Sequence, residues 1–211
     1  SFHFGVEAAD HNMALAKSGT IYQSDTLAGA IVATANRITD SESFESFLKL
    51  FLHGEIKLSS TFYCYEASLG DNDKGMPVYF LPMPKIVTLK ETDHYKVIRK
   101  LRFVSHAVWQ EGFDRVDEWI DNPDYHIIQG QFLIKAGELP ENVKYLIRER
   151  VDPKVKVHAE EGHDDRLFNV SSVQLREEGG VQLYFMYDLG EIEESQKRLF
   201  FTCLEVLSND S

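Results

Sequence analysis

The side chains best suited to metal or acid–base chemistry gather in one acidic segment. His158 and His163 belong to the run HAEEGHDD at residues 158–165. The helical zinc motif needs its histidines four residues apart on one face, which this spacing does not provide, and Gly162 favours a loop. Charge runs of this kind are usually solvated surface. We therefore expect an acidic loop, and neither a metal site nor a cofactor.

A second histidine, His11, lies in a polar segment at residues 10–23 that we expect to form a loop together with Lys17 and Ser18. Its ordinary pKa suits a general acid or base. The sequence fixes no second catalytic group beside it, so we favour a non-catalytic histidine. The motifs of nucleotide-dependent enzymes and of serine nucleophiles are absent from the sequence.

Ser24, Asp25 and Thr26 come just before an apolar stripe at helical spacing. Ser24 suits the N-cap position, and Asp25 suits the first helical turn. Backbone N–H groups at such a helix start also favour an anion, for example an RNA phosphate. Both interpretations, a plain cap and a phosphate site, stay open.

Basic side chains are scarce and form two clusters. The first consists of Lys96, Arg99, Lys100 and Arg102 and covers most of residues 97–104, which alternate as a strand does. The second cluster consists of Lys144, Arg148, Arg150, Lys154 and Lys156. The first cluster could contact phosphates or protect an edge strand by its charge, and the sequence does not separate these two possibilities.

Three tyrosines, Tyr63, Tyr65 and Tyr79, lie in predicted strands. They could stack on bases, as aromatic side chains do in RNA-binding sheets. Packing within the sheet is the simpler interpretation, because aromatic residues favour strands generally.

The composition limits the class of protein. The chain has 211 residues and a formal net charge of −12, which argues against nucleic-acid binding over the whole surface but allows a local basic strip. It also suits contact with basic protein partners. Cys64 and Cys203 lie far apart, so we expect no disulfide framework and a cytoplasmic location. We expect no membrane span and no signal peptide.

The first part of the chain predicts a strand at residues 1–8, a helix at 25–38 and a second helix that Asp40 or Ser41 caps and Gly54 ends. Two strands follow, at residues 57–66 and 77–81. The middle predicts a strand at 97–104, a short helix at 109–120, a strand at 125–135 and an amphipathic stretch at 143–150. The last third predicts strands at 169–175 and 181–187, joined in a hairpin around Gly179 and Gly180, and a helix near 193–207.

This order of elements favours an α+β fold with an antiparallel sheet. A ferredoxin-like (RRM-like) βαββαβ core with a large insertion fits it best. We expect residues 1–92 to form the first part of the core, 93–165 the insertion and 166–211 the second part. The last strand of that core would lie beyond Ser211.

Three segments together resemble one family. They are FHFGVE at residues 2–7 followed by SDTLAGA at 24–30, then YFLPMPK at 79–85, and DRLF at 165–168 leading to GVQLYF at 180–185. Their order and spacing are similar to those of the RAMP superfamily of type III CRISPR effector complexes, most of all to subunit four of the Csm complex. Subunit three of the Cmr complex would look similar. The resemblance covers both ends of the chain, and residues 93–165 match weakly.

The resemblance implies a crRNA-binding subunit that caps the 5′ end of the guide RNA. It would link the large polymerase-like subunit to the backbone RAMP subunits and would not cleave the target. RNA would contact the loop with His11, Lys17 and Ser18 and the helix start at Ser24–Thr26, and Lys96, Lys100 and Arg102 would add phosphate contacts. Two features depart from the family: its glycine-rich loop after the last helix is missing here, and residues 158–165 are acidic.

Two alternatives belong to other classes. One is a metal-independent crRNA-processing endoribonuclease of the same superfamily, with His11 or His158 as acid or base. The other is a protein-interaction module that touches no RNA, which the acidity of the chain and the missing loop support.

Overall fold

The computed structural model describes residues 19–66, 76–84, 94–114, 116–156, 166–176 and 180–209. The predicted first strand, the loop with His11, Lys17 and Ser18, and the acidic run at 158–165 lie outside these residues. The chain divides into two compact units. The helical unit comprises Ile21–Thr61 and Tyr184–Ser211, and the sheet unit is built on Phe62–Leu183. The domain boundaries expected from the sequence stay a prediction.

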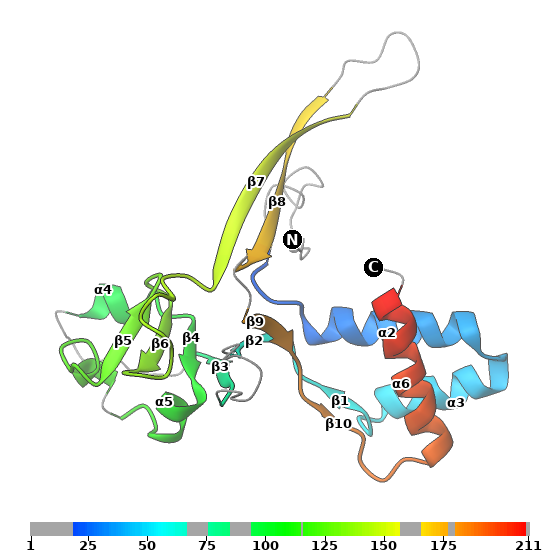
Figure 1. Cartoon of the computed structure of the whole chain (residues 1–211). Coiled ribbons are helices and arrows are strands. Elements are labelled where there is room, and N and C mark those ends of the chain that lie inside the picture. The colour runs from blue at the N-terminus through cyan, green and yellow to red at the C-terminus, as the bar shows by residue number, and fades with distance from the viewer. Residues whose placement is uncertain are drawn as a thin grey trace, which may run out of the picture. The chain divides into compact units, whose positions relative to one another are not determined.

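Three helices and a short two-stranded sheet make up the helical unit. The helices are α2 (Ser24–Ile38), α3 (Ser41–Leu52) and α6 (Glu194–Asn209). The strands β1 (Lys57–Leu58) and β10 (Tyr187–Asp188) pair antiparallel (Figure 1). The three helices predicted in this part of the chain are therefore confirmed.

An apolar core joins α2 to α6. Leu27 and Ile31 of α2 are buried in one cluster with Phe200 and Cys203 of α6, and Leu199 and Leu204 pack against that cluster. The stripe at helical spacing explains this contact, because residues three and four apart share one helix face. Helices α2 and α6 therefore pack against each other through these residues.

The second helix has the capping expected from its sequence. The Asp40 carboxylate accepts hydrogen bonds from the N–H groups of Glu42 (3.1 Å) and Ser43 (3.0 Å), two donors that the helix itself cannot satisfy. These bonds lower the pKa of Asp40 below its ordinary value. Gly54, with a φ of +73°, follows the end of the helix.

A six-stranded sheet forms the centre of the sheet unit, in the order β5-β6-β4-β3-β2-β9. Its strands are β2 (Phe62–Tyr65), β3 (Val78–Pro82), β4 (Phe103–Ser105), β5 (Tyr125–Ile128), β6 (Phe132–Lys135) and β9 (Val181–Tyr184). The β4–β6 pair is parallel, and β2–β3, β3–β4 and β5–β6 are antiparallel. Buried aromatic rings of Tyr63, Phe80, Phe103 and Phe132 contact one another on this sheet.

A separate two-stranded ribbon belongs to the same unit. Strands β7 (Ile147–Lys156) and β8 (Arg166–Leu175) pair antiparallel, from Ile147 opposite Leu175 to Lys156 opposite Arg166 (Figure 1). The sequence indicated β8 as a strand but described residues 143–150 only as an amphipathic stretch. The α+β class with a largely antiparallel arrangement is confirmed, whereas the ferredoxin-like βαββαβ core stays a prediction.

The predicted strand at residues 97–104 is wrong. Residues Tyr95–Ile98 form the short helix α4, a turn follows, and only Phe103–Ser105 are extended as β4. Ile98 and Leu101 are both buried, and their spacing of three residues places both on one side of a helical turn. Apolar and basic residues also alternate over 97–104, and this alternation favoured a strand in the sequence analysis.

The predicted hairpin around Gly179 and Gly180 is also wrong. The two strands that flank it exist, but β8 pairs with β7, and β9 lies beside β2. Gly180 serves another purpose, because its carbonyl accepts a hydrogen bond of 2.7 Å from the N–H of Glu66. The glycine permits a close approach of two backbones that are distant in sequence.

Two further elements of the middle segment differ from expectation. In place of one helix at 109–120, the helix α5 (His106–Gln110) is followed by Gly112 with a φ of +79° and by a 3-10 turn, η1 (Val116–Glu118). The expected strand at 125–135 is a hairpin, because Gln129 and Gly130 both have positive φ and reverse the chain between β5 and β6.

Candidate nucleic-acid interface

The basic residues predicted to contact phosphates are on the surface of the sheet unit. Lys96, Lys100 and Arg102 are exposed, whereas Ile98 and Leu101 between them are buried against Val104, Val108 and Trp119. The buried pair fixes the backbone, so the charged side chains must point away from the core. None of the three forms an ion pair with a carboxylate of the described residues. Their charge therefore faces solvent.

The short helix that carries Lys96 is held at its start. The ring of His94 lies 2.8 Å from the Asp121 carboxylate, Nε2 to Oδ2. The carbonyl of His94 also accepts the N–H groups of Val97 (2.9 Å) and Ile98 (3.0 Å). These contacts fix the position of α4 on the unit, and the sequence did not indicate the histidine–aspartate pair.

A second group of cations surrounds a tyrosine where the β7–β8 ribbon begins. The guanidinium carbon of Arg148 lies over the Tyr145 ring, 4.1 Å from its centre, and that of Arg176 lies 5.9 Å from the same centre. Lys144 is exposed next to this tyrosine in sequence. Cations over an aromatic face are attracted by the ring quadrupole.

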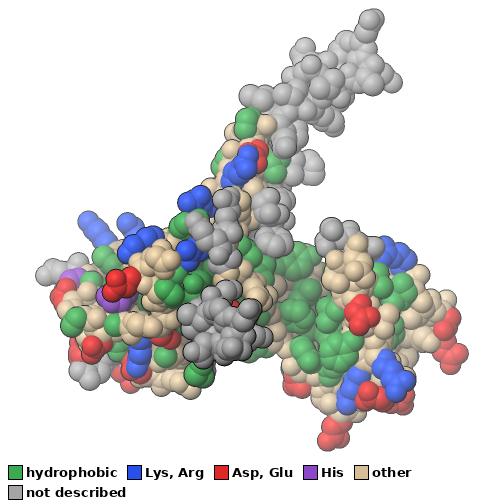
Figure 2. All heavy atoms as spheres, in the orientation of Figure 1, with side chains coloured by type: hydrophobic (Ala, Val, Ile, Leu, Met, Phe, Trp, Pro, Cys, Tyr) green, Lys and Arg blue, Asp and Glu red, His purple; other side chains and the backbone are tan. Residues whose placement is uncertain are grey.

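The turn between β5 and β6 connects the two groups of cations. The Gln131 carbonyl accepts the N–H of Arg102 (2.9 Å), and the Gln129 side chain accepts the N–H of Leu146 (2.9 Å) and donates to the Ile147 carbonyl (2.7 Å). The two basic segments are therefore neighbours. We call the combined set the cationic surface; it consists of Lys96, Arg99, Lys100, Arg102, Lys144, Arg148 and Arg176. Figure 2 shows lysine and arginine side chains gathered over this side of the sheet unit, from α4 to the start of the ribbon.

The tyrosines considered for base stacking behave differently from one another. Tyr63 and Tyr65 are buried, so packing within the sheet is confirmed for both. The Tyr63 hydroxyl donates to the Thr20 carbonyl, and burial raises the pKa of this hydroxyl well above its ordinary range. Tyr79 is 42% exposed on β3.

The helix start at Ser24 lies in the helical unit. The N-cap residue of α2 is Gln23, so the expected capping role of Ser24 is wrong. The N–H of Ser24 donates to the Ser60 hydroxyl (3.1 Å), and the N–H of Thr26 donates to the Asp25 carboxylate (2.8 Å). Two of the donors that would attract a phosphate therefore already have oxygen partners. The predicted contact of Ser24, Asp25 and Thr26 with RNA stays a prediction.

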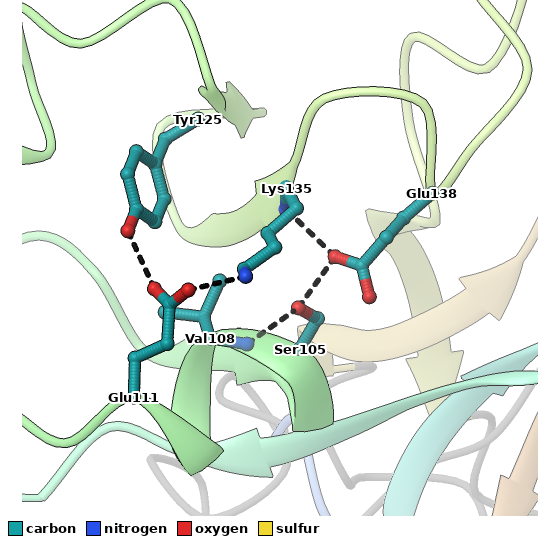
Figure 3. A network of polar contacts seen from close by, with 6 residues as sticks. All are labelled: Ser105, Val108, Glu111, Tyr125, Lys135 and Glu138. Carbon is teal, nitrogen blue, oxygen red and sulfur yellow. Dashed lines mark hydrogen bonds and ion pairs between the residues drawn. The ribbon is translucent and has the colours of Figure 1, made fainter.

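A polar network on the sheet unit connects α5 to strand β6 (Figure 3). The Ser105 hydroxyl donates to Glu138 (2.6 Å) and accepts the N–H of Val108 (3.3 Å), and the N–H of Lys135 also donates to Glu138 (2.6 Å). Glu111 binds the Lys135 ammonium and the Tyr125 hydroxyl, and these two bonds lower the pKa of Glu111.

Each polar group of this network has a structural use. The serine hydroxyl caps α5, and both glutamates are held by donors from Ser105, Tyr125 and Lys135 of the sheet strands. Ser105 is fully buried, and its hydroxyl is engaged by Glu138 and by the N–H of Val108, so it is not presented to a substrate as a nucleophile would be. Within the described segments, no three His, Cys, Asp or Glu side chains lie close enough together to hold a metal ion.

Sequence reasoning found part of the cationic surface and missed the rest. It named Lys96, Lys100 and Arg102 as contacts and included Arg148 in a basic cluster. It missed Tyr145 and Arg176, because the pairing of β7 with β8 is what brings Arg176 to Tyr145. The available local signal was the spacing of three residues between Tyr145 and Arg148.

Comparisons with known proteins show a similarity of fold to a solved structure. No family model matches the sequence, and no curated protein matches it. A chain of a solved structure described as the crystal structure of the Csm3-Csm4 subcomplex in the type III-A CRISPR-Cas interference complex is similar, with a TM-score of 0.62 and 20% sequence identity. The similarity covers 90% of this chain and 60% of that chain. This chain thus spans about 60% of the length of the chain it matches.

The similarity agrees with the three sequence segments described above. The resemblance to the RAMP subunits of type III CRISPR complexes is therefore confirmed as a similarity of fold. The helices of the described segments lack the combination of length and apolar character that a membrane crossing requires.

Proposed function

We propose that this chain is an RNA-binding subunit of a type III CRISPR interference complex. In the finer form of the proposal, it caps the 5′ end of the crRNA and links the large polymerase-like subunit to the backbone RAMP subunits. The fold similarity to a chain of a Csm3-Csm4 subcomplex supports the place in such a complex. Such a complex would act in the cytoplasm.

The observation that carries the RNA-binding part is the cationic surface. The chain as a whole has a net charge of −12, yet seven lysine and arginine residues are held together on one side of the sheet unit. Phosphate groups bind to such a surface by releasing condensed counterions. Acidic side chains, which outnumber basic ones in this chain, would keep a surface solvated equally well. The concentration of basic side chains here therefore favours an anionic partner.

We propose that the role is non-catalytic. RNA cleavage without a metal needs an acid and a base within reach of one phosphodiester. His94 is the described histidine closest in sequence to the cationic surface, and its Nε2 is occupied by Asp121. His11 and His158, the candidates of the endoribonuclease alternative, lie outside the described residues.

The experiment compares RNA retention in the assembled complex. The triple variant K96A/K100A/R102A removes three charges of the cationic surface, and K49A/K57A/K197A removes three lysines of the helical unit as a control. Each variant is co-expressed with the other subunits and the guide RNA, and the RNA per purified complex is measured. We expect the first variant to lose RNA and the control to keep it. Equal retention by both variants would contradict the proposal.

A second candidate function is protein docking without RNA contact, and one observation favours it. On the helical unit, Tyr187 and Phe201 form an edge-to-face pair with centroids 5.8 Å apart, although they are 50% and 41% exposed; Met186 beside them is 51% exposed. Exposed apolar clusters often mark interfaces. Phe201→Asp should then weaken co-purification of a partner subunit, whereas Leu52→Asp, at another exposed apolar position, should not.

A further inference from the structure

Arg148 and Tyr145 make a cation–π contact at the start of the ribbon. The guanidinium carbon lies 4.1 Å from the ring centre, close enough for the two groups to touch over the face of the ring. Tyr145 is half-buried, whereas Arg148 is exposed. The tyrosine therefore supports the arginine from the protein side and leaves the guanidinium accessible from solvent.

The backbone around this pair is fixed on both sides. Ile147 pairs with Leu175 and Arg148 with Gln174 in the ribbon, and the N–H of Arg176 donates to the Leu146 carbonyl (3.0 Å). The Gln129 side chain holds Leu146 and Ile147 from the neighbouring turn. A side chain that is already ordered loses little conformational freedom when a ligand binds, which favours affinity.

Arg148 differs from Arg150 in its partners. The two arginines are two residues apart on β7, so their side chains project from the same face of the strand. The Nε of Arg150 lies 2.7 Å from the Asp152 carboxylate, so its charge is paired. Arg148 has no ion pair with a carboxylate of the described residues. The two arginines thus offer a matched comparison: similar exposure, the same strand, and different partners.

A planar guanidinium supported by an aromatic ring suits one class of ligand. Unstacked nucleobases of single-stranded RNA stack on arginine planes and aromatic rings. A guanidinium also binds a phosphate through its fork of N–H groups, but that contact uses the edge of the group and needs no aromatic ring behind its face. The extra feature here is the aromatic ring that lies against the guanidinium, and it points to a base.

We propose that Arg148, supported by Tyr145, is a stacking platform for a nucleobase of single-stranded RNA, with Arg176 and Lys144 near the phosphates beside that base. The inference rests on the proposed function and adds to it a named base-binding position. It predicts that the cationic surface prefers RNA with bases over the same backbone without them.

Filter binding with the full chain tests this preference. The probes are oligoadenylate and an abasic ribose-phosphate oligomer of the same length, each at several salt concentrations. Stacking of one base is expected to favour oligoadenylate by about five-fold or more for the parent chain. Arg148→Lys keeps the charge but removes the plane, so it should lower this ratio towards one while the salt slope stays the same. Arg150→Lys should leave the ratio unchanged.

A second variant, Tyr145→Leu, tests the platform independently in case Arg148→Lys impairs folding. Tyr145→Leu keeps Arg148 and removes its support, and it should lower the ratio in the same direction; circular dichroism checks that both variants fold. If the parent binds both probes equally, or if Arg148→Lys retains the parent's preference, the platform is overturned while the proposed RNA binding stands. If the parent binds neither probe and the assembled complex retains no RNA, both are overturned.

Discussion

The carbonyl of Gly180 accepts a hydrogen bond of 2.7 Å from the N–H of Glu66, across more than a hundred residues of sequence. A β-carbon at residue 180 would lie 2.8 Å from the Tyr65 ring and 2.9 Å from the Glu66 carbonyl oxygen. The second neighbour is backbone and cannot turn aside. With a φ of +81°, the residue also has a conformation that side chains disfavour. The absence of a side chain at Gly180 therefore allows the backbone to lie directly against the end of β2.

Gly180→Ala is expected to destabilise the protein by roughly 1–3 kcal/mol, from the positive φ together with the steric overlap. Urea unfolding with separate probes for the two units would measure the change. Gly29→Ala is the control, because its β-carbon would meet nothing within 4 Å on the exposed side of α2. That substitution should stabilise the helix by about 0.5–1 kcal/mol. Equal effects of the two substitutions would contradict the close approach.

The cap of α3 should make stability depend on pH in a defined direction. Hydrogen bonds from Ser43 and Glu42 lower the folded-state pKa of Asp40 below its ordinary value of 3.8. A carboxyl group with a lowered pKa contributes stability above the unfolded pKa and loses it as the pH falls through the folded pKa. Asp40→Asn keeps a capping oxygen without the charge.

We therefore expect the stability of the parent relative to Asp40→Asn to be constant near neutral pH and to decrease below pH 3.8. Urea unfolding at a series of pH values measures this difference. A difference that stays flat down to acidic pH would mean that the carboxylate bonds do not stabilise the helix in solution.

The three helices of the helical unit were predictable because each carries its own pattern. The stripe of Leu27 and Ile31, the cap at Asp40 and the stop at Gly54 are local signals, and each occurs where the sequence indicated. Most strand pairings were not predictable. Gly179 and Gly180 are typical of a hairpin turn, but strand pairing depends on partners distant in sequence, and here β9 lies beside β2.

The candidate site shows the same limit. Charge is visible in a sequence, so Lys96, Lys100 and Arg102 were found, although on a helix and turn rather than on a strand. The contact of Arg176 with Tyr145 was not found, because residues 145 and 176 are brought together by the pairing of β7 with β8.

The isolated chain is expected to show no nuclease activity, with or without divalent metal. No pair of acid–base groups or set of metal ligands occurs at usable spacing in the sequence. A labelled guide-RNA precursor incubated with the purified chain and with His11→Ala and His158→Ala variants would test this. Cleavage by the parent that His11→Ala abolishes would instead support the endoribonuclease alternative.

Asp25 should not hinder RNA binding, although it is negative and lies at a helix start. Its carboxylate accepts the N–H of Thr26 at 2.8 Å and so serves the first turn of α2. Asp25→Lys is therefore expected to leave RNA retention in the complex nearly unchanged and to weaken the helix start slightly. A marked gain in RNA retention would mean that this helix start is in contact with phosphate and that Asp25 repels it.

The salt dependence of binding should report how many charges of the cationic surface contact RNA. Each phosphate contact that is removed should flatten the slope of log K against log salt by about 0.7 for a single strand. K96A/K100A/R102A should therefore lower the slope by about two if all three residues bind phosphate. The variant should stay folded, because surface charge substitutions usually cost under about 0.5 kcal/mol. Its buried neighbours Ile98 and Leu101 are untouched. An unchanged slope in a folded variant would mean that these charges only solvate the surface and that the RNA path lies elsewhere on the chain.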